Sequence, residues 1–283
     1  MSGETDFLAA MARASEARSA AAAAAVPLRE LVAAIRDVPA GPTLRLSAEG
    51  FDLIMELKLS SPANGVLAAD SLDARAQVER YAAAGAAVVS VLTEPERFRG
   101  TLDHLTTAVA ALRPHGIPVM RKDFLVDAYQ LYEARRYGAG GVLLICRMLT
   151  PQRLRELVML AADLGLFVLL ETFDEADIAA AAAVARDWSG PARELLIGVN
   201  SRDLVTLKVV PERLLALAGH LPRAWPRVAE SGLNDAADAR RLAGAGYDLA
   251  LVGTALMAAP DPVRLGADML SAGRDAIRAR SAP

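Results

Sequence analysis

A repeated alternation of short apolar runs and longer amphipathic stretches constrains the fold of this 283-residue chain more than any other feature. From Phe51 onward the apolar runs begin roughly every 22 to 35 residues. The eight runs are DLIMELK, AAVVSVLT, IPVMRK, GGVLLIC, LFVLLET, ELLIGVN, WPRVAES and DLALVGT. Runs that are apolar almost throughout are typical of parallel strands buried on both faces.

The stretches between the runs have helical patterns, for example residues 72–86, 151–165 and 234–246, and several end in glycine, as helices prefer. Eight strand–helix units predict an α/β fold, the closed (β/α)8 TIM barrel. A doubly wound open sheet is the alternative. It usually has fewer units and a glycine-rich first turn, and no GxGxxG follows an early run here.

Residues 5–38 predict one or two helices ahead of the barrel, with Pro27 in the first turn of the second helix. Two prolines and a glycine within residues 39–42 then interrupt the helical pattern. We therefore expect an N-terminal helical extension, residues 1–45, and a catalytic barrel domain, residues 46–283.

Composition bears on partners and location. A net charge of −3, a pI near 5.7 and the lack of a long basic run give little reason to expect nucleic acid or an anionic membrane as partner, although a small anion could bind locally. No stretch approaches the roughly 18 apolar residues of a spanning helix, and acids stand where a signal peptide would be basic. The single cysteine, Cys146, lies in an apolar run and suits the core. We expect a cytoplasmic protein and a monomer, although these patterns do not encode oligomeric state.

In such barrels the active site lies at the carboxyl ends of the strands, so the last residues of each run are candidates. They are Glu56, Lys58, Lys122, Glu171, Asn200, Glu230, Ser231, Gly253 and Thr254. Polar groups at one end of otherwise apolar strands are costly to bury unless they are paired or functional. A purely structural salt-bridge network is the alternative interpretation.

Only three lysines occur in the chain, and two of them, Lys58 and Lys122, end apolar runs. A lysine can transfer a proton near neutral pH when burial and neighbours lower its pKa, whereas a guanidinium stays protonated. Glu56 and Lys58 are two residues apart on a strand, so they point the same way and can form an ion pair. Together with Glu171 and Lys122 they would push each other's pKa values apart, giving one site a proton donor and an acceptor.

The third lysine and the three histidines are not expected to belong to the active site. The third lysine, Lys208, is expected beyond the loop after the sixth run and away from the mouth. His104, His115 and His220 fall in helix or loop segments and have no metal-ligand spacing, so no metal site is expected.

The last two units predict a phosphate site. Gly232 follows the seventh run, while Gly253 and Thr254 end the eighth ahead of a short helical segment, where barrels of this type bind phosphate through backbone N–H groups. A glycine after a strand is more often only a turn, but the position in the eighth unit favours a phosphorylated substrate.

Seven segments in order resemble the indole-3-glycerol phosphate synthase family of tryptophan biosynthesis, from about residue 51 to 260. They are MELKLSSPANG, SVLTEPERFRGTLDHL, MRKDFLVDAYQLYEARRYGA, LLETFDEAD, IGVNSRDL, VAESGL and ALVGTAL. The RKDF and NSRDL blocks are specific. Tryptophan synthase α-subunit and phosphoribosylanthranilate isomerase share the phosphate site but not the ExK pair followed by RKDF. The resemblance also accounts for the N-terminal helices, since the family carries an extension that covers the barrel mouth.

The resemblance implies a carboxy-lyase that closes the ring of 1-(2-carboxyphenylamino)-1-deoxyribulose 5-phosphate, with loss of CO₂ and water, and that needs no cofactor or metal. It implies that Lys122 is the general acid that protonates the substrate carbonyl as the ring carbon attacks. Glu171 and Lys58 are candidates for the dehydration, and Glu56 would orient Lys58 and stabilise a cationic intermediate.

The resemblance also implies a set of binding residues. Hydroxyl and carboxylate groups of the substrate would be held by Asn200, Ser231 and Glu230, with Arg202 as a nearby anchor. The apolar walls would be Phe124 and Leu204, and the phosphate would be received by Ser61, Gly232, Gly253 and Thr254.

Two departures from the family's pattern fall in the first loop. Leu59 stands where a basic residue is usual, and Ser61-Pro62-Ala63 replaces a Ser-Pro-Ser turn. This loop closes over substrate in the family, so the changes bear on loop closure and phosphate affinity.

Three rival functions stay open. They are a paralogue acting on a modified anthranilate, a phosphate-binding isomerase or aldolase-like lyase that forms a Schiff base through Lys58 or Lys122, and a non-catalytic barrel that binds a phosphorylated indole or anthranilate. The intact acid and base set argues against the last.

Overall fold

All eight apolar runs form strands, and almost all of their side chains are buried. The computed structural model describes residues 2–61, 65–67, 72–203 and 206–281, and only the backbone of residues 2–6, 61, 66 and 281. The strands are β1 (Asp52–Leu57), β4 (Val88–Leu92), β5 (Val119–Lys122), β6 (Gly141–Ile145), β7 (Phe167–Thr172), β8 (Leu195–Asn200), β9 (Arg227–Glu230) and β10 (Leu249–Val252). They pair in parallel as a closed barrel in the order β1-β10-β9-β8-β7-β6-β5-β4, so the predicted (β/α)8 barrel is confirmed and the open sheet is wrong.

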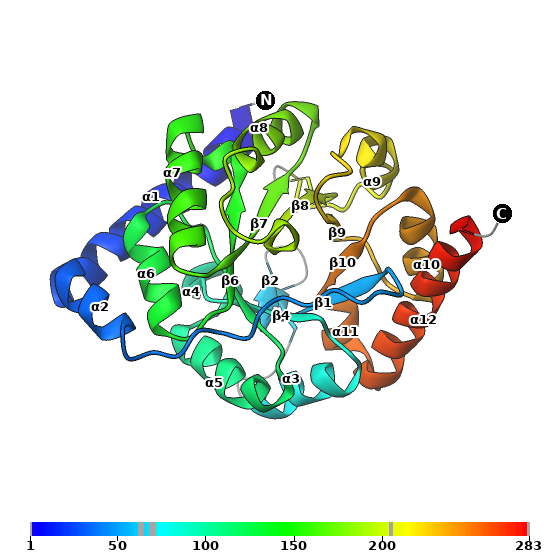
Figure 1. Ribbon diagram of the computed structural model, residues 1–283, viewed down its shortest axis with the longest axis horizontal. Coiled ribbons are helices and arrows are strands. Elements are labelled where there is room, and N and C mark those ends of the chain that lie inside the picture. Colours follow the sequence, from blue (N-terminus) through cyan, green and yellow to red (C-terminus); the bar gives the residue numbers. More distant parts are fainter. Residues whose placement is uncertain (1, 62–64, 68–71, 204–205, 282–283) are drawn as a thin grey trace.

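Helices follow the strands and surround the barrel (Figure 1). The longer ones are α3 (Ala74–Ala83), α5 (Leu102–Leu112), α6 (Ala128–Arg136), α7 (Pro151–Asp163), α8 (Glu175–Ala185), α9 (Glu212–Leu217), α10 (Ala236–Ala245) and α12 (Pro262–Ser281). The short elements are α4 (Pro95–Phe98), α11 (Thr254–Ala258), the 3-10 turns η1 (Arg113–His115), η2 (Cys146–Met148), η3 (Ala192–Glu194) and η4 (Ala218–His220), and the hairpin strands β2 (Ser60–Ser61) and β3 (Gly65–Val66). Within the described ranges, none of the helices combines the length and the apolar character needed to cross a membrane.

Side-chain caps fix where the loops at the barrel mouth end. The carboxylates of Asp127, Asp174 and Asp235 accept hydrogen bonds from backbone N–H groups in the first turns of α6, α8 and α10. An aspartate at this position satisfies donors that the helix itself leaves unpaired. Each of these loops therefore runs between a strand and a fixed helix start.

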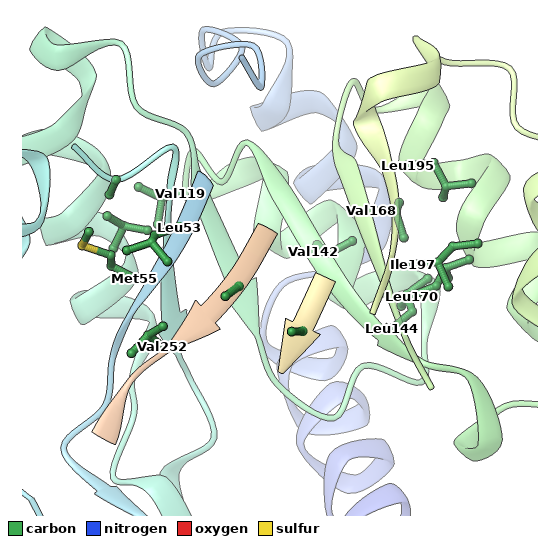
Figure 2. Packing of buried hydrophobic residues seen from close by; sticks show 14 of the residues in the cluster. Leu53, Met55, Val119, Val142, Leu144, Val168, Leu170, Leu195, Ile197 and Val252 are labelled. Carbon is green, nitrogen blue, oxygen red and sulfur yellow. The ribbon is translucent and has the colours of Figure 1, made fainter. Parts of the chain in front are cut away.

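Strand alternation divides the core into two clusters. Residues such as Leu53, Met55 and Val142 face outward and pack under the helices, and Figure 2 shows ten labelled members of this outer cluster. Residues such as Ile54 and Leu169 face inward and fill the barrel. Because successive side chains on a strand alternate between faces, the polar residues two positions further on also point inward, at the mouth.

Two helices precede the barrel, α1 (Ser2–Ala25) and α2 (Leu28–Ile35), as expected, although α1 begins ahead of the range 5–38 that was expected to be helical. Pro27 occupies the N-cap of α2, one position before the first turn in which it was expected. Leu8 and Met11 of α1 join the inner cluster, so this helix lies against the mouth of the barrel.

Polar contacts fasten α1 to the segment that follows β5. The Ser15 hydroxyl donates to the Phe124 carbonyl oxygen and accepts from Gln130 Nε2 at 2.8 Å. Arg18 Nη2 donates to Asp123 Oδ1 at 2.8 Å. The N-terminal extension is thus connected directly to the residues next to Lys122.

A tight contact inside the barrel gives the first testable prediction. Gly141 and Phe167 are paired in register, and a Cβ atom at position 141 would lie 2.4 Å from the Phe167 ring. We expect Gly141→Ala to lower the free energy of unfolding by about 1–3 kcal/mol, measured by urea denaturation, because an added methyl group overpacks a filled core.

A matched glycine provides the control for this measurement. Gly244 lies in α10, and a Cβ atom added there would have no neighbour within 4 Å, so Gly244→Ala should leave stability unchanged or slightly raised. Adding Phe167→Leu to Gly141→Ala should recover part of the loss. If Gly141→Ala is as stable as the parent, the barrel interior is looser than described.

Candidate active site

Charged side chains at the carboxyl ends of β1, β5 and β7 meet in the barrel mouth. Glu56 Oε1 and Lys58 Nζ are 3.0 Å apart, so the predicted ion pair is confirmed. Lys122 Nζ lies 3.8 Å from Glu56 Oε2 and 3.9 Å from Glu171 Oε2. The exposed fraction of these four side chains is at most 19%, so the charges interact in a largely desolvated space.

The pKa of Lys122 moves in the direction opposite to the one expected for a catalytic lysine. Burial alone would lower it, but the carboxylates of Glu56, Glu171 and Glu230 outweigh burial and raise the pKa above its ordinary value. The expectation of a lowered lysine pKa is therefore wrong at this position. Lys122 is a fully charged ammonium at neutral pH, which suits a proton donor and not a base or nucleophile.

Glu56 is ionised despite being buried. Burial raises its pKa, but the ammonium groups of Lys58 and Lys122 lower it further, and the net shift is downward. Gly253 leaves room for this pair, since a Cβ atom there would lie 2.5 Å from Glu56 Oε1 and 3.2 Å from Lys58 Nζ. Gly253 therefore has a steric role in the charged cluster, in addition to the phosphate role expected for it.

The pKa of Glu230, at the end of β9, shifts upward, opposite to that of Glu56. It is 1% exposed, and burial followed by the neighbouring Glu171 carboxylate raises its pKa well above the ordinary value. Within the described chain, both Glu230 carboxyl oxygens, Glu56 Oε2 and Glu171 Oε2 are buried without a hydrogen-bond partner. Glu56 Oε2 and Glu171 Oε2 still have the Lys122 ammonium within 4 Å, whereas the two Glu230 oxygens have no ion-pair partner among the described residues either, and it is these that favour a ligand site over a purely structural network.

The charged cluster lines a cavity of about 90 Å³, which we call the inner pocket. Its lining is Phe7, Leu8, Glu56, Lys58, Leu92, Phe98, Lys122, Phe124, Ile145, Glu171, Asn200, Arg202, Leu207, Glu230, Ser231 and Leu251. Phe124, expected as an apolar wall, packs edge-on against Phe7 with ring centroids 6.2 Å apart, and Phe98 lies 6.3 Å away. One side of the inner pocket is thus aromatic and the other is charged.

A second cavity of about 800 Å³, the outer cavity, adjoins the inner pocket and shares six lining residues with it. Its own lining includes Gly232, Gly253 and Thr254, the residues predicted to receive phosphate. Gly253 is the N-cap of α11, so the short helix expected after β10 is confirmed. Ser231 and Gly232 adopt left-handed backbone angles, φ 67° and 83°, and turn the chain sharply beside this cavity.

Lys208 also lines the outer cavity, so the expectation that it lies away from the mouth is wrong. The chain after β8 folds back on itself. Val210 N donates to Ser201 O at 2.8 Å, and Asp203 N donates to Lys208 O at 2.8 Å. This return brings residues after the loop to the mouth, which periodicity alone could not indicate.

Of the other predicted binding residues, two line the inner pocket and two are described only in part or not at all. Asn200 and Arg202 line the inner pocket, and Asn200 Oδ1 accepts the Arg202 backbone N–H at 2.9 Å. Leu204 lies outside the described residues, and of Ser61 only the backbone, in β2, is described. Leu59, one of the two departures in the first loop, is buried at 9% exposure.

The histidines and the cysteine lie elsewhere. His104, His115 and His220 belong to α5, η1 and η4 and line neither cavity. Cys146 is buried in the outer cluster, as its apolar run predicted. Burial raises the pKa of its thiol. Across the described ranges, no three histidine, cysteine, aspartate or glutamate side chains gather as metal ligands.

Sequence reasoning missed part of the apolar wall. Phe7, Leu8, Phe98 and Leu251 line the inner pocket but were not predicted. One signal was available, because the chain has only six phenylalanines and three of them meet here. Their meeting depends on α1 lying across the mouth, which no local pattern specifies.

Comparison with known proteins identifies a matching family. A model of the family described as indole-3-glycerol phosphate synthase matches residues 9–265. The indole-3-glycerol phosphate synthase of Salinibacter ruber is 41% identical over 219 residues, covering 77% of this chain and 76% of the relative. That of Mycobacterium tuberculosis is 39% identical over 259 residues, covering 92% and 86%.

Solved structures share the fold at low sequence identity. The 3-hexulose-6-phosphate synthase of Salmonella typhimurium superposes with a TM-score of 0.58 at 12% identity, covering 80% of this chain and 99% of that one. The thiamine phosphate pyrophosphorylase of Pyrococcus furiosus gives 0.57 at 15% identity, covering 80% and 96%. These likenesses concern the barrel alone.

The raised pKa of Glu230 predicts a pH-dependent cost to folding. Above pH 4.5 the carboxyl ionises in the unfolded chain but stays protonated in the folded one, so stability falls as pH rises toward its folded pKa. We expect Glu230→Gln, which cannot ionise, to gain stability relative to the parent as pH rises from 4.5 to 7.5.

Urea unfolding at several pH values measures this difference. Gly244→Ala serves as the control, since it changes no titrating group and its stability difference from the parent should be flat. A flat difference for Glu230→Gln as well would show that the Glu230 carboxyl ionises normally in the folded protein.

Proposed function

Because the chain belongs to the indole-3-glycerol phosphate synthase family, we propose that its inner pocket and outer cavity together hold 1-(2-carboxyphenylamino)-1-deoxyribulose 5-phosphate. The enzyme is a decarboxylating lyase of tryptophan biosynthesis, and it closes the indole ring with loss of carbon dioxide and water. The observation that carries the site assignment is the Lys122 ammonium, 19% exposed, held between Glu56 and Glu171 in a pocket with an aromatic wall.

Lys122 acts in ring closure. The aromatic ring of the substrate lies on Phe124, Phe7 and Phe98, and its carboxyl-bearing carbon attacks the substrate carbonyl carbon. As that bond forms, the charged Lys122 gives its proton to the carbonyl oxygen, which becomes a hydroxyl group. The Glu56 carboxylate stabilises the cationic ring that results until carbon dioxide leaves and its bonding electrons restore aromaticity.

Dehydration then completes the indole. A proton goes to the departing hydroxyl group and another leaves the neighbouring carbon, so this step needs one acid and one base. Lys58 contacts Glu56, and Glu171 contacts Lys122, so we assign Glu171 and Lys58 to the dehydration step. Coupled groups of this kind titrate as a set. The reaction as a whole consists of one carbon–carbon bond formation, a decarboxylation and the loss of water, and the side chains named here donate and accept the protons of these steps.

The two cavities divide the substrate between them. The phosphate enters the outer cavity, at Gly232, Gly253 and Thr254, where backbone N–H groups and a helix start favour an anion. The substrate's carboxylate and hydroxyl groups meet Asn200, Arg202, Ser231 and Glu230. The two carboxyl oxygens of Glu230 have no hydrogen-bond partner in the described chain. Ser61 and Leu204 keep their proposed phosphate and apolar roles.

Two further expectations concern the location and the oligomeric state of the enzyme. The chain's one cysteine is buried, which suits a reducing compartment, and we propose that the enzyme works in the cytoplasm as a monomer.

Among the rival functions, a Schiff-base lyase needs a neutral amine, and the raised pKa of Lys122 disfavours a neutral amine at that position. A modified anthranilate substrate stays a second candidate, because Leu59 alters the first loop.

The function is tested by adding the substrate to the purified protein and following indole fluorescence. We expect a rising signal without added metal or cofactor. Silence with binding still detectable would favour the modified substrate. Trapping by borohydride would favour the Schiff-base lyase.

The role of Lys122 is tested by substitution. Lys122→Met should lower turnover by at least about 10³-fold while calorimetry still detects substrate binding, because the phosphate and carboxylate contacts are separate from the proton donor. Lys122→Arg keeps the charge but cannot release a proton, so it should also be inactive. Turnover within about tenfold of the parent in Lys122→Arg would mean that Lys122 supplies charge only.

A further inference from the structure

The segment between β8 and α9 returns to the barrel mouth in two antiparallel limbs, residues 201–203 and 206–210, which we call the hairpin. Its two limbs are joined by an antiparallel bridge between Arg202 and Val209 and by the hydrogen bond from Asp203 N to Lys208 O. Arg202 Nη1 also donates to the Leu207 carbonyl oxygen at 2.7 Å. The position of the return limb is therefore fixed by backbone and side-chain contacts.

This return limb packs against the turn that follows β9. A Cβ atom on Gly232 would lie 2.8 Å from Val209 Cγ1 and 3.2 Å from Ser201 Oγ, so the hairpin touches the backbone predicted to receive phosphate. Lys208 directly precedes Val209 and lines the outer cavity with Gly232, Gly253 and Thr254.

The charges that line the outer cavity are unbalanced. Three cations, Lys58, Arg202 and Lys208, face it with one carboxylate, Glu56. That carboxylate is already engaged by Lys58 at 3.0 Å. In the described chain no carboxylate lies within ion-pair distance of Lys208 Nζ, and the side chain is exposed, so its charge is available to a ligand.

We propose that Lys208 binds the substrate's phosphate as a third cation of the outer cavity. This inference rests on the proposed function for the identity of the anion. A phosphate monoester carries a charge of about −1.5 to −2 at pH 7. The Lys58 ammonium is already paired with the Glu56 carboxylate, so it does not neutralise this charge by itself. Lys208 lies outside the inner pocket, so it acts on affinity and not on proton transfer.

The test compares a substitution that removes the positive charge at position 208 with one that keeps it. Lys208→Ala should weaken binding of inorganic phosphate, measured by calorimetry, and raise the KM for substrate, each by about five- to twentyfold, with kcat within twofold of the parent. Lys208→Arg should retain both affinities within about threefold, because the charge is kept.

The control removes an equal charge at the other end of the barrel. Arg223 is exposed in the loop before β9, away from the mouth, so Arg223→Ala should change neither quantity. Thermal unfolding of each variant shows whether it is folded, and Lys208→Gln replaces the alanine variant if that one is not.

Two results would overturn the inference. One is unchanged phosphate affinity in Lys208→Ala. The other is an equal loss in Arg223→Ala, which would mean that only the overall charge matters. The phosphate measurement does not depend on turnover, so it separates this inference from the proposed function. A parent enzyme that forms no indole but loses phosphate affinity in Lys208→Ala would refute the function and keep the site.

Discussion

The Glu56 carboxylate lies between two ammonium groups, with Lys58 Nζ at 3.0 Å and Lys122 Nζ at 3.8 Å, and its side chain is 4% exposed. The rest of the site depends on this arrangement. The two cations keep Glu56 ionised, and Glu56 in turn helps to keep Lys122 charged, so neither group has the pKa that its burial alone would produce. The absence of a side chain at Gly253 is a condition for the pair, because a methyl group there would occupy the space of Glu56 Oε1.

Charge also distinguishes the two cavities. In the inner pocket three glutamates face two lysines and an arginine, whereas in the outer cavity three cations face one glutamate. A phosphate group is attracted more strongly to the outer cavity, since in the inner pocket it would lie near the carboxylates of Glu56 and Glu171. Under the proposed function, this difference in charge would orient the substrate before any single hydrogen bond is made.

Much of the fold and part of the site could be predicted from the sequence, for local reasons. The eight strands were predictable because each run is apolar on both faces, and the position of Glu56 beside Lys58 followed from strand alternation. Phe7 was missed because its place depends on a helix fastened to a segment 109 residues further along the chain. Lys208 was misplaced because a hairpin reverses the chain before it, and the pKa of Lys122 was misjudged because its direction depends on how many carboxylates lie within reach.

Closure of the barrel between β1 and β10 affects how the enzyme is made. Glu56 lies on the first strand of the barrel and Gly253 follows the last one, yet a Cβ atom on Gly253 would lie 2.5 Å from Glu56 Oε1. A chain that lacks β10 leaves one edge of β1 without its hydrogen-bonded neighbour, so the strand that carries Glu56 is not held in its register. We therefore expect activity to require β10 in place, even where the other strands pair natively.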